Sequence, residues 1–166
     1  MNFNIKNVTK FILPLSLLCI MQACNSGTNY KAIRQQVIDQ HDQLMGDDEK
    51  AMHNKIQLDT LVMPAGMQKL KQAQPQLDTA AERQHINALI KQLNSADDAM
   101  NDWMHNFNPD VQDKNNGAAV SYFKAEKMKV TKLDSAYKVA IKASDDELNK
   151  FHIKAAKPTK APAMKM

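Results

Sequence analysis

Methionine and histidine are the residue types in this 166-residue chain whose spacing could support chemistry. His41 and Met45 are four residues apart, so on a helix they share one face, and Met104 and His105 are neighbours further along. Imidazole and thioether groups suit copper, especially Cu(I), which makes these four residues a candidate metal site. The competing interpretation is that the methionines fill a core and the histidines border it. Because Met45 falls on an apolar seam, we prefer the core interpretation and keep periplasmic copper binding as the alternative.

Motifs that indicate catalysis are missing from the sequence. It contains no Gly-x-Ser-x-Gly elbow, no His-Glu-x-x-His pair and no glycine-rich phosphate loop. Glu82 and His85 match half of a di-iron pattern, but no second Glu-x-x-His accompanies them. We interpret Glu82 as a first-turn acid, His85 as a surface histidine and the run Asp145-Asp146-Glu147 as a solvated face. The prediction is a protein that is not an enzyme.

Trp103 and Phe107 are candidates for docking, since aromatic residues are enriched at the energetic centres of interfaces. Both fall on the apolar seam of a predicted helix. Core packing is therefore the preferred interpretation, and an exposed interaction patch is the alternative.

Helices are the elements expected to position these residues. The chain has four glycines and 5% aromatic residues, and Ala, Gln, Lys, Asp and Met are abundant, which favours helix over sheet. Apolar residues at spacings of three and four predict long helices over about 30–62 and 118–152, with a third seam over 86–107. Short connections make consecutive helices antiparallel. The predicted fold class is all-α, an antiparallel, coiled-coil-like bundle of three long helices.

Local signals predict how these helices begin and continue. Gly46, in the middle of the first helix, predicts a kink or a break there. Pro75 is expected in the first turn of the second long helix, with Thr79 and Glu82 as a capping box. Between the first two long helices, residues 67–73 are predicted to form a short helical continuation.

The first 24 residues have the pattern of a secretory signal that ends in a lipid attachment site. Lys6 and Lys10 precede an apolar run at 11–21, which is shorter than the roughly 20 residues that a membrane-spanning helix needs. The sequence Met21-Gln22-Ala23-Cys24 resembles a bacterial lipobox, in which a diacylglycerol-modified cysteine becomes the first residue of the mature chain. An ordinary signal peptide cut nearby is the alternative. We expect no cofactor beyond the covalent lipid on Cys24.

These signals divide the chain into four parts: a signal peptide at 1–23, a lipidated tether at 24–29, a helical bundle domain at 30–152 and a basic disordered tail at 153–166. The tether reaches at most about 18 Å from the membrane. Asn25 follows the cysteine in place of the aspartate that, in enteric lipoproteins, favours inner-membrane retention. We therefore expect an outer membrane lipoprotein of the cell envelope, facing the periplasm or the surface.

The charge pattern limits the classes of partner. Residues 24–150 hold 16 basic and 18 acidic side chains, a net charge of −2, so the basic pI comes from the two ends of the chain. This balance removes the usual argument for nucleic acid binding. The predicted partners are the membrane, through the lipid anchor, and an envelope protein, while the oligomeric state is left open.

Two segments resemble small Gram-negative lipoproteins that are often auto-labelled "viral A-type inclusion protein": Asp102-Trp103-Met104-His105-Asn106-Phe107, which precedes a proline-containing loop and a lysine-rich helix, and His41-Asp42-Gln43-Leu44-Met45. The label carries no mechanism. Members often have a proline just after the first-helix methionine, where this chain has Gly46. The resemblance covers most of the mature chain and implies a lipoprotein of unknown function, with no catalytic residues to carry over.

Overall fold

Four helices make up the part of the chain that the structure describes. The computed structural model describes residues 29–155 and 157. The helices are α1 at Tyr30–Val62, α2 at Pro64–Ala73, α3 at Thr79–Asn106 and α4 at Asn116–Lys150. Since these described residues include no strand, the all-helical fold class is confirmed. Within the same residues, no helix combines the length and the apolar character that crossing a membrane requires.

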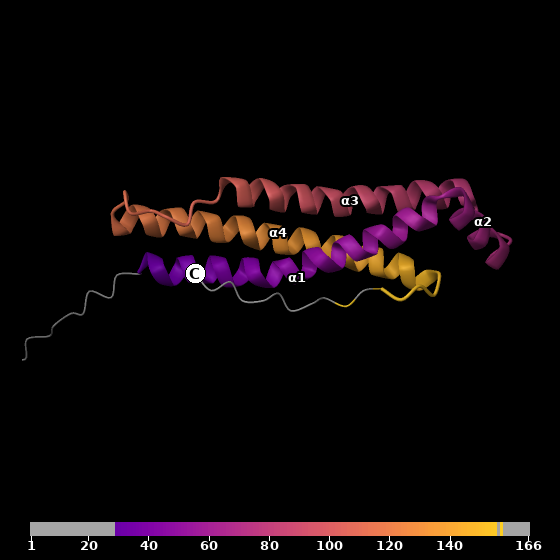
Figure 1. Cartoon of the computed structure of the whole chain (residues 1–166), viewed down its shortest axis with the longest axis horizontal. Helices are drawn as coiled ribbons and strands as arrows, with labels where there is room; N and C mark the ends of the chain where they lie inside the picture. The colour runs from indigo at the N-terminus through magenta and orange to yellow at the C-terminus, as the bar shows by residue number, and fades with distance from the viewer. Residues whose placement is uncertain (1–28, 156, 158–166) are drawn as a thin grey trace, which may run out of the picture.

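The long helices α1, α3 and α4 lie alongside one another, and the short helix α2 turns away at one end (Figure 1). α1 and α4 run in the same direction and share the most extensive contact, whereas α3 runs in the opposite direction and packs against both. Polar side chains join the helices as well. Gln40 on α1 donates to Thr131 on α4 over 3.1 Å, and Lys150 on α4 donates to Glu82 on α3 over 2.7 Å.

Asp78 caps the beginning of α3. Its carboxylate accepts hydrogen bonds from the backbone N–H groups of Ala80 and Ala81, at 3.0 and 3.1 Å. The expected capping box at Thr79 is therefore wrong, because Thr79 is already helical and the aspartate before it satisfies the free N–H groups. Pro75 lies in the turn that precedes the helix rather than in its first turn, which corrects a second expectation.

The chain breaks between α1 and α2 and not at Gly46, through which α1 stays helical. The expected break at Gly46 is therefore wrong, because the penalty of a helical glycine, about 1 kcal/mol, is small beside the packing of a long helix. Pro64 takes the first position of α2, where its missing N–H costs nothing. Gly66 allows the tight junction, since a Cβ there would lie 2.5 Å from the carbonyl oxygens of Thr60 and Leu61.

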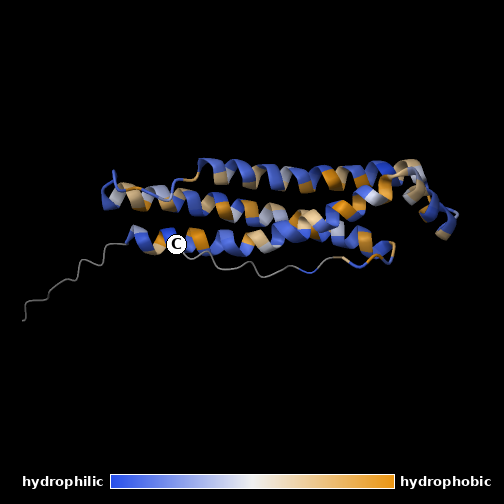
Figure 2. Ribbon diagram, viewed as in Figure 1, coloured by the Kyte–Doolittle hydropathy of each residue, from blue (hydrophilic) through white to orange (hydrophobic). Residues whose placement is uncertain are grey.

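Apolar residues recur among polar ones along the three long helices, as amphipathic helices require (Figure 2). They meet in one continuous core that includes the fully buried side chains of Leu58, Ile86, Met100 and Tyr137. A smaller cluster packs where α1 and α4 begin, around Ile33, Val111, Ala119 and Phe123. Burial of each large apolar side chain contributes about 1.5–3 kcal/mol, so packing along the bundle axis is the main source of stability.

A polar group interrupts this core between α1 and α4. Asn54 has no exposed surface, and its amide donates to Ser144 Oγ over 2.9 Å and to Asp145 Oδ1 over 2.7 Å. Lys50 Nζ donates to the other oxygen of Asp145 over 2.5 Å. The expected solvated face is therefore wrong at Asp145, because two side chains of α1 hold its carboxylate at the helix interface.

Neighbouring positions on α1 provide a matched test of the core. Leu58 has no exposed surface, whereas Ile56 is 54% exposed. We expect Leu58→Ala to lower the free energy of unfolding by about 2–5 kcal/mol, because it removes buried methyl groups and leaves a cavity. Ile56→Ala is the control, with an expected change of about 1 kcal/mol or less. Urea denaturation followed by circular dichroism measures both, and equal losses in the two variants would contradict the observed packing.

Candidate functional site

The structure brings His41 of α1 and Met104 of α3 into contact. His41 Nε2 lies 3.4 Å from Met104 Sδ, and His41 Nδ1 lies 3.3 Å from Asp42 Oδ1. His41 is 9% exposed, but Met104 is 39% exposed. A nitrogen donor and a sulfur donor from two helices therefore meet at the edge of the core, and one of them is open to solvent.

Trp103 and Phe107 form an apolar wall beside this pair. The ring centroids of His41 and Trp103 are 5.5 Å apart, and those of Trp103 and Phe107 are stacked at 4.8 Å. The Trp103 indole N–H donates to Glu126 Oε2 over 2.8 Å, and Lys129 donates to the other oxygen of Glu126 over 2.7 Å. Trp103 is buried in the core, and the half-buried Phe107 packs against it.

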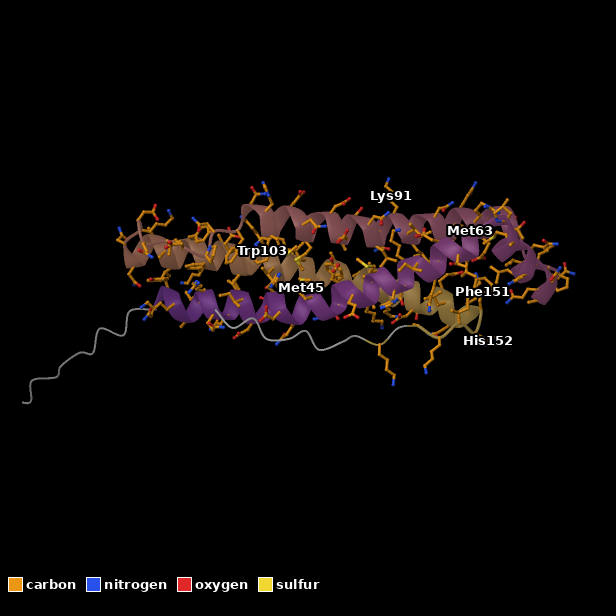
Figure 3. All side chains as sticks on the ribbon, viewed as in Figure 1. Met45, Met63, Lys91, Trp103, Phe151 and His152 are labelled. Carbon is orange, nitrogen blue, oxygen red and sulfur yellow. The ribbon has the colours of Figure 1, made fainter. Side chains whose placement is uncertain are left out.

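The other two candidate ligands are placed differently. Met45 is half-buried on α1, one helical turn beyond His41, and Figure 3 labels it on that helix with Trp103 on α3. His105 is exposed in the last turn of α3, so the structure does not bring it into the His41–Met104 contact. Among residues 29–155 and 157, no three His, Cys, Asp or Glu side chains are arranged to hold a metal ion. A metal site here depends on thioether ligands.

Several sequence predictions concern residues outside the described part of the chain. The signal peptide at 1–23 and the lipidation residue Cys24 lie there, as does most of the basic tail at 153–166. These assignments stay predictions.

A buried ionic cluster lies at the opposite end of the bundle, between α3 and α4. Glu82 and Glu147 are only 8% and 5% exposed. Lys150 Nζ donates to both oxygens of Glu82, over 2.8 and 2.7 Å, and lies 3.4 Å from Glu147 Oε1. His85 Nε2 lies 3.2 Å from Glu147 Oε2. Glu82 lies in the first turn of α3, as predicted, and is in addition buried at the helix interface. The interpretation of Glu147 as a solvated residue is wrong, since Glu147 is buried at the same interface.

Burial raises the pKa of Glu147, and its hydrogen bond with Glu82 raises it further. Burial by itself would also raise the pKa of Glu82, but hydrogen bonds from Glu147 and Lys150 lower that pKa below its ordinary value. Of the two carboxyl groups, Glu147 is therefore the one that takes up a proton first as the pH falls. Lys150 stays charged, because its hydrogen bonds and ion pairs with the glutamates outweigh its burial and raise its pKa.

The sequence does contain a signal for this cluster. Glu82 stands four residues before the fully buried Ile86, and Glu147 stands three residues after the fully buried Ser144. Residues at these spacings share a helix face. Each glutamate therefore extends a buried stripe, and the pairing with Lys150 offsets the cost of burying a charge there.

A cleft of about 260 Å³ opens between α1 and α3, lined in part by Asp48, Met52, Ile56, Leu93 and Asp97. Met52 and Ile56 are 55% and 54% exposed. The cleft therefore offers an apolar contact surface beside two carboxyl groups and the side chain of Lys55.

Comparison with known proteins identified no matching family model, no matching curated protein and no matching solved structure.

The raised pKa of Glu147 predicts a pH-dependent effect of Glu147→Gln. A group whose pKa is raised in the folded state stabilises that state below its unfolded pKa, near the ordinary 4.5, and this contribution is lost as the pH rises through the folded value. The amide mimics the protonated carboxyl group and does not titrate. We therefore expect the stability of the variant relative to the wild type to increase as the pH rises from about 4 towards neutrality.

Thermal unfolding at a series of pH values measures this effect. Asp146→Asn is the control, because Asp146 is the next residue and its side chain is 64% exposed. Parallel pH profiles for Glu147→Gln and the wild type would contradict a raised pKa at Glu147.

Proposed function

We propose that this protein is a lipid-anchored helical bundle of the cell envelope, which acts by binding or spacing and not by catalysis. The observation that carries the proposal is the N-terminal pattern of Lys6 and Lys10, an apolar run and the lipobox-like sequence that ends at Cys24. The finer architecture belongs to the same proposal: an antiparallel bundle of three long helices, cut from its signal peptide and followed by a disordered basic tail.

The position of the anchor supports a spacer role. Cys24 stands six residues before Tyr30, the first residue of α1. A lipid on Cys24 would therefore place the beginning of α1 next to the membrane. α1 has 33 residues, and at 1.5 Å per residue it is about 50 Å long. The junction of α1 with α2 would then be presented up to about 50 Å from the anchored end of the bundle.

The described polar groups support binding over catalysis. Glu82 and Glu147 are engaged with Lys150 at a helix interface, and Asp145 is held by Asn54 and Lys50. Groups paired in this way stabilise the association of helices. They do not converge on the cleft between α1 and α3, whose lining residues are different.

That cleft is the surface that best fits an envelope protein partner. Met52 and Ile56 offer exposed apolar side chains on α1, and Asp48 and Asp97 lie beside them. A partner segment with an apolar side chain next to a lysine or arginine would complement this combination. We place the outer membrane as the default location, on the strength of Asn25 after the modified cysteine.

Removal of the anchor tests the proposal. In Gram-negative cells, we expect Cys24→Ser to abolish incorporation of labelled fatty acid and to move the protein from the membrane fraction to the soluble or precursor fraction. Fractionation with metabolic palmitate labelling measures both effects. Cys19→Ser is the matched control, because Cys19 lies in the proposed signal peptide and should leave labelling unchanged. Continued labelling of Cys24→Ser would refute the lipid anchor.

A further inference from the structure

We propose that His41 and Met104 are two ligands of a Cu(I) site on the side of the bundle, with Met45 as a third ligand and Trp103 as its aromatic neighbour. The contact between His41 Nε2 and Met104 Sδ at 3.4 Å is the observation that carries the proposal. The inference does not depend on the lipid anchor, because all four residues belong to α1 and α3.

The neighbours of His41 favour the tautomer in which Nε2 can bind a metal. A carboxylate can only accept a hydrogen bond, so the contact between Nδ1 and Asp42 Oδ1 at 3.3 Å places a proton on Nδ1. In the neutral imidazole, Nε2 then carries a lone pair, and it points at the thioether sulfur of Met104. A carboxylate that accepts a hydrogen bond from the other ring nitrogen is the arrangement that orients metal-binding histidines. Two lone-pair donors thus face one another.

The separation of the two donor atoms suits one shared ion. Metal–nitrogen bonds of about 2.0 Å and metal–sulfur bonds of about 2.3 Å are usual for a d¹⁰ ion. With those bond lengths, the 3.4 Å separation corresponds to a nitrogen–metal–sulfur angle of roughly 100°, close to tetrahedral. His41 and Met104 therefore need little movement to bind.

The chemistry of the donors selects the metal. Thioether sulfur is a soft ligand that favours Cu(I) over harder ions such as Zn²⁺ or Mg²⁺. Met45 is half-buried one turn along α1 from His41, the spacing at which two side chains on a helix can reach a common point. It can supply a second thioether from the same helix face.

Trp103 lies beside the proposed site without acting as a ligand. Its ring centroid lies 5.5 Å from that of His41, and the hydrogen bond from its indole N–H to Glu126 holds the ring in place. A cation within about 6 Å of an indole face is stabilised by the ring electrons. The buried indole also excludes water from the core side of the proposed site. Met104 is 39% exposed, so a metal ion can reach the site from that side.

A Cu(I) titration of the full chain in detergent micelles, under anaerobic conditions, tests the site. Trp103 is the single tryptophan of the chain, so its fluorescence reports directly from the proposed site. We expect one Cu(I) per chain, transferred from its bicinchoninate complex, and a fluorescence change that saturates at one equivalent. Ag(I), a redox-inert analogue, should produce the same stoichiometry, and Zn²⁺ should not compete.

Single substitutions assign the ligands. Met104→Leu keeps the size of the side chain and removes the sulfur, and we expect it to weaken Cu(I) binding at least about tenfold. Met45→Leu should also weaken binding. The matched control is Met128→Leu, because Met128 is 63% exposed on α4 and should leave the affinity unchanged. His41→Gln should abolish the fluorescence change, provided that circular dichroism shows a folded variant.

Two results would overturn the proposal. One is the absence of a saturable fluorescence change with Cu(I) and Ag(I) in the wild type. The other is equal Cu(I) affinity in Met104→Leu and the wild type. This second test can be made even if His41→Gln fails to fold, because Met104 is partly exposed and its replacement should leave the fold intact. Neither result bears on the lipid anchor, which Cys24→Ser tests separately.

Discussion

The hydrogen bonds of buried Asn54 hold α1 in register with α4, and the rest of the bundle depends on this register. A slip of one helical turn, about 5.4 Å, would separate Asn54 from Ser144 and Asp145 and leave polar groups buried without partners. Each such group costs about 1–3 kcal/mol. An apolar interface alone tolerates such a slip more easily, because one aliphatic contact replaces another.

A second buried contact between α1 and α4 also holds the two helices in register. The Tyr137 hydroxyl of α4 donates to Asp48 of α1 over 2.7 Å, and Tyr137 has no exposed surface. Burial, together with this hydrogen bond, raises the pKa of Tyr137, so it stays a neutral donor. With α1 and α4 aligned at these two levels, α3 can pack against both, and His41 comes to lie against Trp103 and Met104.

Helix positions and core seams were largely predictable from the sequence, because they depend on local periodicity. The expected range 30–62 matches α1, and Trp103 is buried as its place on a seam indicates. Pairing between helices was not predictable in the same way. Asp145 and Glu147 look like a solvated acidic run until Lys50 and Asn54 of α1 are brought to Asp145, and His85 of α3 is brought to Glu147.

The candidate metal ligands also show which features follow from local spacing and which depend on the pairing of helices. The shared face of His41 and Met45 follows from their spacing, but only the crossing of α1 and α3 selects Met104 over its neighbour His105.

The methionines of α3 show why residue type alone cannot distinguish packing from ligation. Met100 and Met104 are one turn apart, yet Met100 is 1% exposed in the core and Met104 is 39% exposed against an imidazole nitrogen. A buried methionine among apolar side chains can be replaced by leucine with little loss. Leucine in place of Met104 would keep the packing and lose the sulfur atom that contacts His41 Nε2.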